Sequence, residues 1–235
     1  MSTAARDAHI SRAASLFYSA LKKQRTAFLK RTTAKLKKLY EASSPEVPRI
    51  LPSLPPIALK PTISKLLTKA GTDGANHTNV MLGISPLQTT PQRVKDYIAE
   101  HSLEQIGADL DATTVSEIRT ILETGLEAQT PFSKIITEIK QAGAFSRQRA
   151  QTIAVTEVGN AYSQGLLGQG KELQDEGLDM EKSWLAEDEP CDICAGNADE
   201  GWIDIDDDFS SGDDAPLAHP NCLCALLMRR AGSGE

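Results

Sequence analysis

Apolar residues recur every three or four positions between about residues 10 and 40, which is the spacing of one face of an α-helix. The pattern predicts one long amphipathic helix. Ser43-Ser44-Pro45 ends it, and five further prolines follow by residue 61. Because proline fixes φ and removes a backbone donor, this stretch predicts an extended connector. The residues of the apolar face are Ile10, Ala14, Phe17, Leu21, Phe28, Leu36 and Leu39.

The chain after the connector carries helix signals of uneven strength. A short helix is predicted over Thr62–Ala70, ended by the glycines of Gly71-Thr-Asp-Gly74, with Ala75–Asn79 continuing as loop. On this interpretation His77 is a loop histidine and not a ligand.

Three capped helices and a longer fourth helix are predicted next. Thr-Pro pairs at 90–91 and 130–131 predict the starts of two of them, and Asp111 or Thr113 is expected to cap the helix between. Ser146 begins the fourth, which runs to about Gly177. Since the connections are short, these helices predict a compact bundle.

After residue 178 the residue pattern favours β-strands, and short strands are predicted at 183–186, 201–205 and 222–228. The predicted fold class is mainly α: a helical bundle with a long N-terminal basic helix and a small C-terminal α+β cysteine-rich module, for which zinc is one candidate ligand. We place a basic amphipathic helix at 1–42, a Pro-rich linker at 43–61, a helical domain at 62–178 and the C-terminal module at 179–235.

Composition supports this class, because aromatic residues are only 5% of the chain and the core must come from aliphatic side chains. That favours packed helices over a β-sandwich. No N-terminal apolar segment resembles a signal peptide, and no apolar run approaches the ~18 residues that a membrane span requires. We therefore expect an unsecreted protein with no membrane partner.

Charge is distributed unevenly behind the net value of -7. The first forty residues carry Asp7 as their single acid, whereas acids outnumber bases about four to one from Ala161 onward. The basic helix could be a solvated face, or it could contact DNA phosphates or an acidic protein surface. A membrane-surface helix fits less well, because the apolar face is thin and lacks Trp. The candidate DNA-binding residues are Lys22, Lys23, Arg25, Lys30, Arg31, Lys35, Lys37 and Lys38.

All the cysteines lie in two short motifs near the C-terminus, Cys191-Asp-Ile-Cys194 and His219-Pro-Asn-Cys222-Leu-Cys224. The spacing Cys-x-x-Cys lets two sulfurs bind one tetrahedral metal ion. Cys222 and Cys224 lie two residues apart on a predicted strand, so their side chains would lie on the same face and could approach the same ion. Three thiolates with the imidazole, or four thiolates, would complete a structural zinc site, so one candidate is spare. The alternatives are two disulfides, free thiols, or a redox pair, although no βαβ pattern accompanies the motif.

Other candidate sites are weaker. Glu157 interrupts an apolar helical stripe and needs a partner, for which Arg147, Arg149 or backbone donors are candidates; a catalytic base is the alternative. The acidic run at 204–208 is not a calcium loop, because Phe209 stands where glycine is required. A metal-dependent nuclease is not expected, since no second histidine lies near His219 to hold a catalytic cation.

The order of these motifs resembles the phage Mu F-like head morphogenesis family, the minor capsid proteins of tailed bacteriophages. The resemblance runs from about Gln92 to Met228. Two positions depart from the family pattern, since Val155 and Leu223 stand where Arg is usual. The matching residues are Arg149, Ile153, Ala154, Thr156, Glu157, Ala161, Trp184, Asp188, Cys191, Cys194, His219, Pro220, Asn221, Cys222 and Cys224.

The resemblance implies a non-enzymatic, structural minor head protein that associates with the portal vertex and takes part in head assembly, DNA packaging or ejection. The implied partners are the phage portal protein, other head proteins such as capsid or scaffold, and viral DNA. The implied location is the virion head near the portal, with the host cytoplasm during assembly. Structural roles are expected for Trp184 and Asp188, and for Glu157 through the buried salt bridge proposed above. A DNA-binding packaging or regulatory factor that uses the basic helix is the rival hypothesis.

Overall fold

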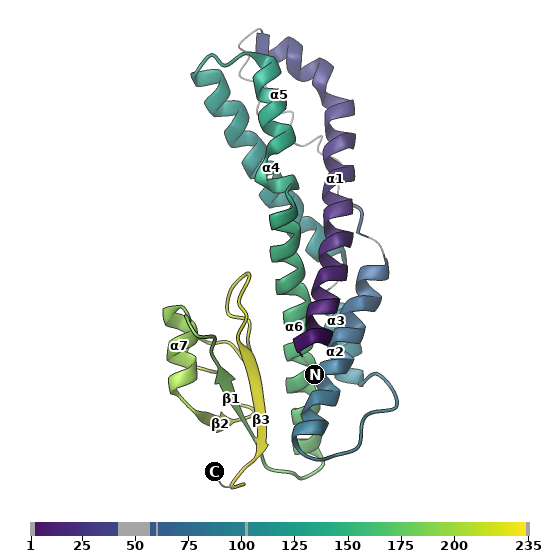
Figure 1. Ribbon diagram of the computed structural model, residues 1–235, viewed down its shortest axis with the longest axis vertical. Helices are drawn as coiled ribbons and strands as arrows, with labels where there is room; N and C mark the ends of the chain where they lie inside the picture. Colours follow the sequence, from purple (N-terminus) through teal and green to yellow (C-terminus); the bar gives the residue numbers. More distant parts are fainter. Residues whose placement is uncertain (1–2, 42–56, 60, 102, 234–235) are drawn as a thin grey trace. The chain divides into compact units, whose positions relative to one another are not determined.

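The computed structural model describes residues 3–41, 57–59, 61–101 and 103–233. These residues form seven α-helices, one short 3-10 helix and a three-stranded sheet near the C-terminus (Figure 1). The predicted fold class, mainly α with a long N-terminal helix and a small C-terminal sheet, is confirmed. Of the predicted linker, residues 43–56 and 60 lie outside the described residues.

The chain forms two compact units. One unit contains residues 1–13, 62–101 and 152–235, and the other contains residues 14–61 and 102–151. The helices α1 (Thr3–Glu41) and α6 (Arg147–Asp175) each contribute residues to both units. The domain boundaries expected at 42, 61 and 178 remain sequence predictions.

The second unit buries the apolar stripe of α1, in which Phe17, Leu21 and Phe28 are fully buried. It also holds α4 (Leu103–Glu127), α5 (Phe132–Gln141) and the 3-10 helix η2 (Gly143–Phe145). The start of α4 at Leu103 corrects the cap predicted at Asp111 or Thr113. Asp111 lies inside the helix, where its carboxylate accepts the Gln24 side-chain amide and, at 3.2 Å for each oxygen, the backbone N–H of Ile57. These tertiary hydrogen bonds, and not a helix end, account for that acidic residue.

The first unit contains α2 (Pro61–Met81) and α3 (Gln92–Glu100), together with most of α6. The helix break predicted at Gly71 and Gly74 is wrong, because α2 runs through both glycines. A Cβ atom at Gly74 would lie 2.1 Å from the Tyr162 carbonyl oxygen, and one at Gly165 would lie 2.0 Å from the Gly71 carbonyl oxygen. The glycines therefore permit backbone contact between α2 and α6, and they do not end the helix.

His77 consequently lies on α2, and the predicted loop at 75–79 is also wrong. Its Nδ1 lies 2.6 Å from the Tyr162 hydroxyl of α6. The cross-helix hydrogen bond from the Thr78 hydroxyl to the Leu166 carbonyl, 3.0 Å long, adds to this contact. Both interactions follow from the close approach that the glycines allow.

The two ends of α6 agree with the sequence prediction. At its start the Ser146 hydroxyl accepts the backbone N–H of Arg149 at 3.0 Å, as a helix cap does. At its end Gly177 has a φ of 96°, and the Leu178 N–H donates to the Leu173 carbonyl at 3.0 Å. This left-handed glycine termination reverses the chain toward the sheet.

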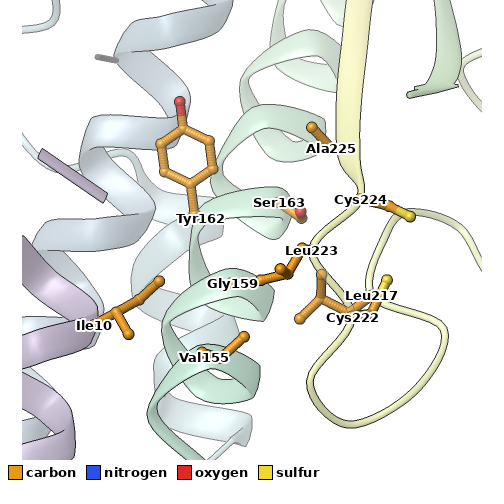
Figure 2. A pocket seen from close by; sticks show the side chains of 10 residues that line it. All are labelled: Ile10, Val155, Gly159, Tyr162, Ser163, Leu217, Cys222, Leu223, Cys224 and Ala225. Atoms are coloured by element: carbon orange, nitrogen blue, oxygen red, sulfur yellow. The ribbon is translucent and has the colours of Figure 1, made fainter. Parts of the chain in front are cut away.

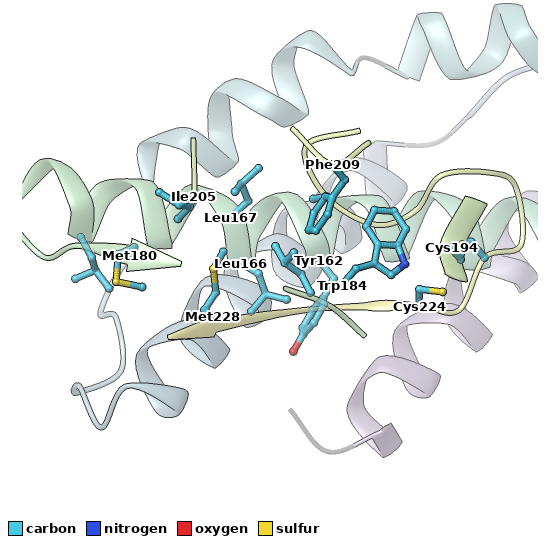
Figure 3. Close-up of a cluster of buried hydrophobic side chains, with 14 residues drawn as sticks. Tyr162, Leu166, Leu167, Met180, Trp184, Cys194, Ile205, Phe209, Cys224 and Met228 are labelled. Carbon is cyan, nitrogen blue, oxygen red and sulfur yellow. The ribbon is translucent and has the colours of Figure 1, made fainter. Parts of the chain in front are cut away.

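The sheet is antiparallel in the order β2-β1-β3, formed by β1 (Met180–Leu185), β2 (Trp202–Asp204) and β3 (Ala225–Arg230). Trp184 pairs with Leu226, and Lys182 pairs with Met228 and Ile203, so these residues share one face. Buried side chains from α6 and this sheet face form one apolar cluster (Figure 3). The helix α7 (Asp192–Asp199) follows β1 and was not predicted from the sequence pattern.

No helix in the described part of the chain is long and apolar enough to cross a membrane.

Candidate metal centre

The two cysteine motifs come from different local structures. Cys191 is the residue that precedes α7, and Cys194 lies in the first turn of that helix. His219, Cys222 and Cys224 lie in the irregular segment that leads into β3. The placement of Cys222 and Cys224 on a strand is therefore corrected, because β3 begins only at Ala225. Irregular backbone, and not strand alternation, aims these two side chains.

The structure brings all five predicted ligands together around Cys194. The ligand atoms of Cys191, Cys194 and His219 lie within 4.8 Å of one another, and so do those of Cys194, Cys222 and Cys224. Cys194 Sγ lies 3.7 Å from both the His219 Nε2 and the Cys222 Sγ. All the cysteines are free.

These separations fit the geometry of a zinc ion. A tetrahedral site with Zn–S bonds of about 2.3 Å places its sulfur atoms about 3.8 Å apart, and an imidazole nitrogen in the fourth place lies slightly closer to them. The 3.7 Å distances from Cys194 match this requirement. The donor set of thiols with one imidazole is also the set that zinc prefers.

His219 is held in the tautomer that a metal ligand needs. Its Nδ1 lies 3.0 Å from the Pro220 carbonyl oxygen, which can only accept, so Nδ1 carries the proton. This hydrogen bond raises the pKa of His219, and it leaves Nε2 facing Cys194 with a free lone pair in the neutral ring. A fixed ring with Nε2 exposed to the cluster is the arrangement of a preorganised ligand.

Burial separates the thiols into two kinds. Burial raises the pKa of Cys194 and of Cys222, because a thiolate is costly away from water. Cys191 is exposed, and the backbone N–H of Cys194 lowers its pKa by hydrogen bonding to the sulfur. The buried thiols would ionise only with a cation beside them, which a bound metal supplies.

One hydrogen bond joins the Thr156-Glu157 motif of α6 to the segment that carries His219, Cys222 and Cys224. Asn221 adopts a left-handed conformation with a φ of 62°, and its backbone N–H donates to the Thr156 hydroxyl of α6 at 3.0 Å. The Cys222 N–H closes the turn onto the His219 carbonyl at 3.2 Å. Thr156 therefore anchors the turn that presents His219 and Cys222.

Glu157 has a different partner from the two arginines that the sequence suggested. Its Oε2 lies 2.9 Å from the Nε2 of His101, and only 14% of its side chain is exposed. Arg149 instead donates to Thr114 and to the carbonyl oxygens of Ala144 and Leu110. The reason is geometric, since eight residues of α-helix separate positions 149 and 157 by about 12 Å along the axis.

The other two predicted structural residues differ in burial. Trp184 on β1 is 2% exposed and packs edge-to-face against Phe209, with ring centroids 5.1 Å apart. Asp188 is exposed in the segment between β1 and α7. Trp184 is thus a core residue of the sheet, whereas Asp188 lies at its surface.

An apolar pocket lies beside the cluster, between α6 and the segment that precedes β3 (Figure 2). Val155 and Leu223, the two departures from the family pattern, both line it. Gly159 allows Leu217 to approach α6, since a Cβ there would lie 2.7 Å from the Leu217 side chain. Val155 and Leu223 therefore lie in a single apolar contact region.

The candidate DNA-binding residues lie on α1 within the second unit. Arg25 is half-buried and donates to the Lys140 carbonyl at 2.8 Å, so it is committed to α5. The side chains of Lys35 and Lys38 lie outside the described residues. The exposed members of the predicted set are Lys22, Lys23, Lys30, Arg31 and Lys37.

Comparison with known proteins gives one result. Residues 116–227 match the family described as "Phage Mu protein F like protein". The match includes all five candidate ligands, Thr156 and Trp184, and it confirms the resemblance drawn from the sequence. No curated protein and no solved structure matches the chain.

Proposed function

We propose, from the phage Mu F-like region at residues 116–227, that this protein is a structural minor head protein of a tailed bacteriophage. The family match supports a role related to the phage head. The finer proposal is that the protein associates with the portal vertex, contacts capsid or scaffold proteins, and takes part in head assembly and DNA packaging or ejection. It would lie in the host cytoplasm during assembly and in the virion afterwards.

The observation that carries the proposal is the junction between the two halves of the signature. Thr156 of α6 and the turn of Asn221 are joined directly, and that turn presents ligands of the Cys/His cluster. All of these residues lie inside the matched range. A cluster with this construction holds a surface in place, so we propose a non-enzymatic protein whose C-terminal module is recognised by other head proteins.

Zinc is the cofactor that this cluster would hold. Cys194, Cys222 and Cys224 supply three thiolates, and either Cys191 or His219 supplies the fourth ligand. The ion would neutralise the buried thiolates and cross-link α7 to the segment before β3. Freshly purified, reduced protein should contain about one zinc per chain, as mass spectrometry of the native protein can measure.

The head assignment is tested by tracking the protein through assembly. Procapsids and mature virions are purified from infected cells, and their proteins are quantified by mass spectrometry. We expect the chain in both, and we expect it to co-purify with the portal oligomer when an affinity tag is placed on the portal. Absence from both particles would refute a structural head role.

A DNA-binding packaging or regulatory factor is the second candidate, favoured by the exposed cations of α1. If Lys22, Lys23 and Lys30 neutralise phosphates, the logarithm of affinity should fall with the logarithm of salt by about 0.9 per phosphate on duplex DNA. Replacing Lys22 and Lys23 with glutamine should then flatten the slope by about two phosphates. An affinity that does not change with salt would eliminate this candidate.

A further inference from the structure

Trp184 carries an unpaired polar group in the buried cluster between α6 and the sheet. The side chain is 2% exposed, and its indole Nε1–H has no hydrogen-bond partner among the residues that the structure describes. A buried donor without an acceptor lowers stability, so such groups usually have a partner in the functional state. Indole can only donate, so the missing partner is an acceptor.

The neighbourhood of the ring limits which acceptor this can be. Phe209 packs edge-to-face on Trp184, and aliphatic side chains of α6 and β3 fill much of the cluster. Cys194, Cys222 and Cys224 belong to the same cluster. Figure 3 shows the indole nitrogen at the end of the ring that faces Cys194 and Cys224, away from the methionines at the other end of the cluster.

We propose that the Trp184 indole N–H donates a hydrogen bond to a ligand sulfur of the metal-bound cluster, Cys194 or Cys224. The inference rests on the zinc site of the proposed function. A neutral thiol is a weak acceptor, whereas a metal-bound thiolate carries negative charge and accepts strongly. Metal binding therefore gives the donor its partner, and the donor in turn stabilises the thiolate form of the ligand.

Trp184 is then a positioning residue for the metal site and not only a packing residue. Hydrogen bonds from outside the ligand set orient metal ligands, and losing one typically weakens metal affinity by about 10–100-fold. A phenylalanine would fill most of the same space without the N–H. The indole thus couples the core of the sheet to the charge state of the cluster.

The test compares the two tryptophans of the chain. Zinc affinity is measured by competition with a chromophoric chelator for the native protein, Trp184→Phe and Trp202→Phe. Trp202 is 36% exposed on β2 and stacks under Arg229, so its variant is a matched control. We expect about tenfold weaker binding for Trp184→Phe and unchanged binding for Trp202→Phe.

An isostere separates the hydrogen bond from packing. Benzothienylalanine at position 184 keeps the bicyclic shape and replaces the N–H with sulfur, so it should weaken zinc binding as much as phenylalanine does. In native protein loaded with cadmium-113, NMR should show scalar coupling between the metal and the Trp184 indole proton, and none at Trp202. This measurement does not depend on a variant that folds.

The possible results separate the two proposals. A protein that binds one zinc, with equal affinity in the isostere and no coupling to Trp184, would overturn the hydrogen bond and leave the zinc site standing. A native protein that takes up no zinc would overturn the zinc site and this inference together. Weaker binding by the isostere, with coupling at Trp184 only, would support both.

Discussion

Gly165 provides the sharpest test of how the first unit is packed. It lies where α6 crosses α2, and an added Cβ would be 2.0 Å from the carbonyl oxygen of Gly71 and 2.7 Å from its carbonyl carbon. Both of these atoms are backbone, so no flexible side chain can move aside. Alanine at position 165 would therefore force the two helices apart by more than about 1 Å.

The expected change in unfolding free energy combines three effects. Alanine is about 1 kcal/mol better than glycine inside a helix. Overpacking of a well-packed contact costs about 1–3 kcal/mol, and separation of the helices also weakens the hydrogen bond from Thr78 to the Leu166 carbonyl, worth about 1 kcal/mol. With overpacking at the upper end of its range, Gly165→Ala should lower the free energy of unfolding by about 2–3 kcal/mol.

Gly196→Ala is the matched control. Gly196 is also helical, in α7, but a Cβ there would have no atom within 4 Å. Only the gain in helix propensity remains, so this variant should be more stable by up to about 1 kcal/mol. The same substitution is thus predicted to have opposite signs at the two sites.

The assay is urea unfolding followed by far-ultraviolet circular dichroism, with thermal melts in parallel. A loss of about 2 kcal/mol corresponds to a melting temperature roughly 4–8 °C lower in a chain of this size. Equal stability of Gly165→Ala and the native protein would refute the backbone contact between α2 and α6. A destabilised Gly196→Ala would show that alanine acts through something other than the space around it.

Three further predictions concern the site and its supports. Cys194 belongs to both ligand groups, so Cys194→Ser should reduce zinc from about one per chain to near zero, whereas exposed Cys191→Ser should retain more, as metal analysis can measure. Thr156→Ala removes the acceptor of the Asn221 N–H and should lower the unfolding free energy by about 1 kcal/mol in urea titrations. Burial lowers the pKa of His77 below its usual value of 6.5, so protonation of this residue disfavours the folded state. The stability of the native protein should therefore fall as the pH drops below about 6.5. In thermal melts between pH 7 and 5, His77→Asn should lose less stability than the native protein does.

Each of these predictions has a distinct contrary result. Full zinc content in Cys194→Ser would show that the ion does not bind at the shared ligand. A Thr156→Ala variant with native stability would remove the proposed anchor of the turn. The pKa of His219 is raised, so its contribution to stability changes with pH in the opposite direction to that of His77. The melts of His77→Asn are therefore compared with those of the native protein at each pH. Identical pH dependence of native protein and His77→Asn would contradict the assignment to His77.

The sequence predicted helices well where one local rule sufficed. The apolar spacing from Ile10 to Phe28, the hydroxyl of Ser146 and the terminating Gly177 all act within a few residues of chain, and the structure agrees with each. Gly71 and Gly74 misled the prediction because glycine has two uses, ending a helix or admitting a neighbouring backbone. Only the position of α6, whose backbone lies against Gly71 and Gly74, shows which of these two uses applies.

The site divides in the same way. The five ligand candidates were readable because zinc chemistry restricts the residue types and their spacing in each motif. The missed parts were the helical position of Cys194, the tautomer of His219 and the pairing of Glu157 with His101. The tautomer depends on irregular backbone beside His219, and the pairing depends on a residue distant in the sequence. Helix α7 spans only Asp192–Asp199, which is too short for an apolar periodicity to predict it.

The Cys/His motifs and the upstream Thr156-Glu157 were enough for the sequence alone to identify five candidate donors and the family of the matched region, because short motifs preserve chemistry and local spacing. Only the tertiary structure decided that Thr156 holds the turn of the candidate ligands, that Cys194 is the residue common to both candidate groups, and that the Trp184 N–H lacks a partner among the described residues. These facts arise where α6, α7, β1 and the segment before β3 converge. Burial and hydrogen bonding at such a junction depend on which elements meet in space, and not on the order in which they occur along the chain.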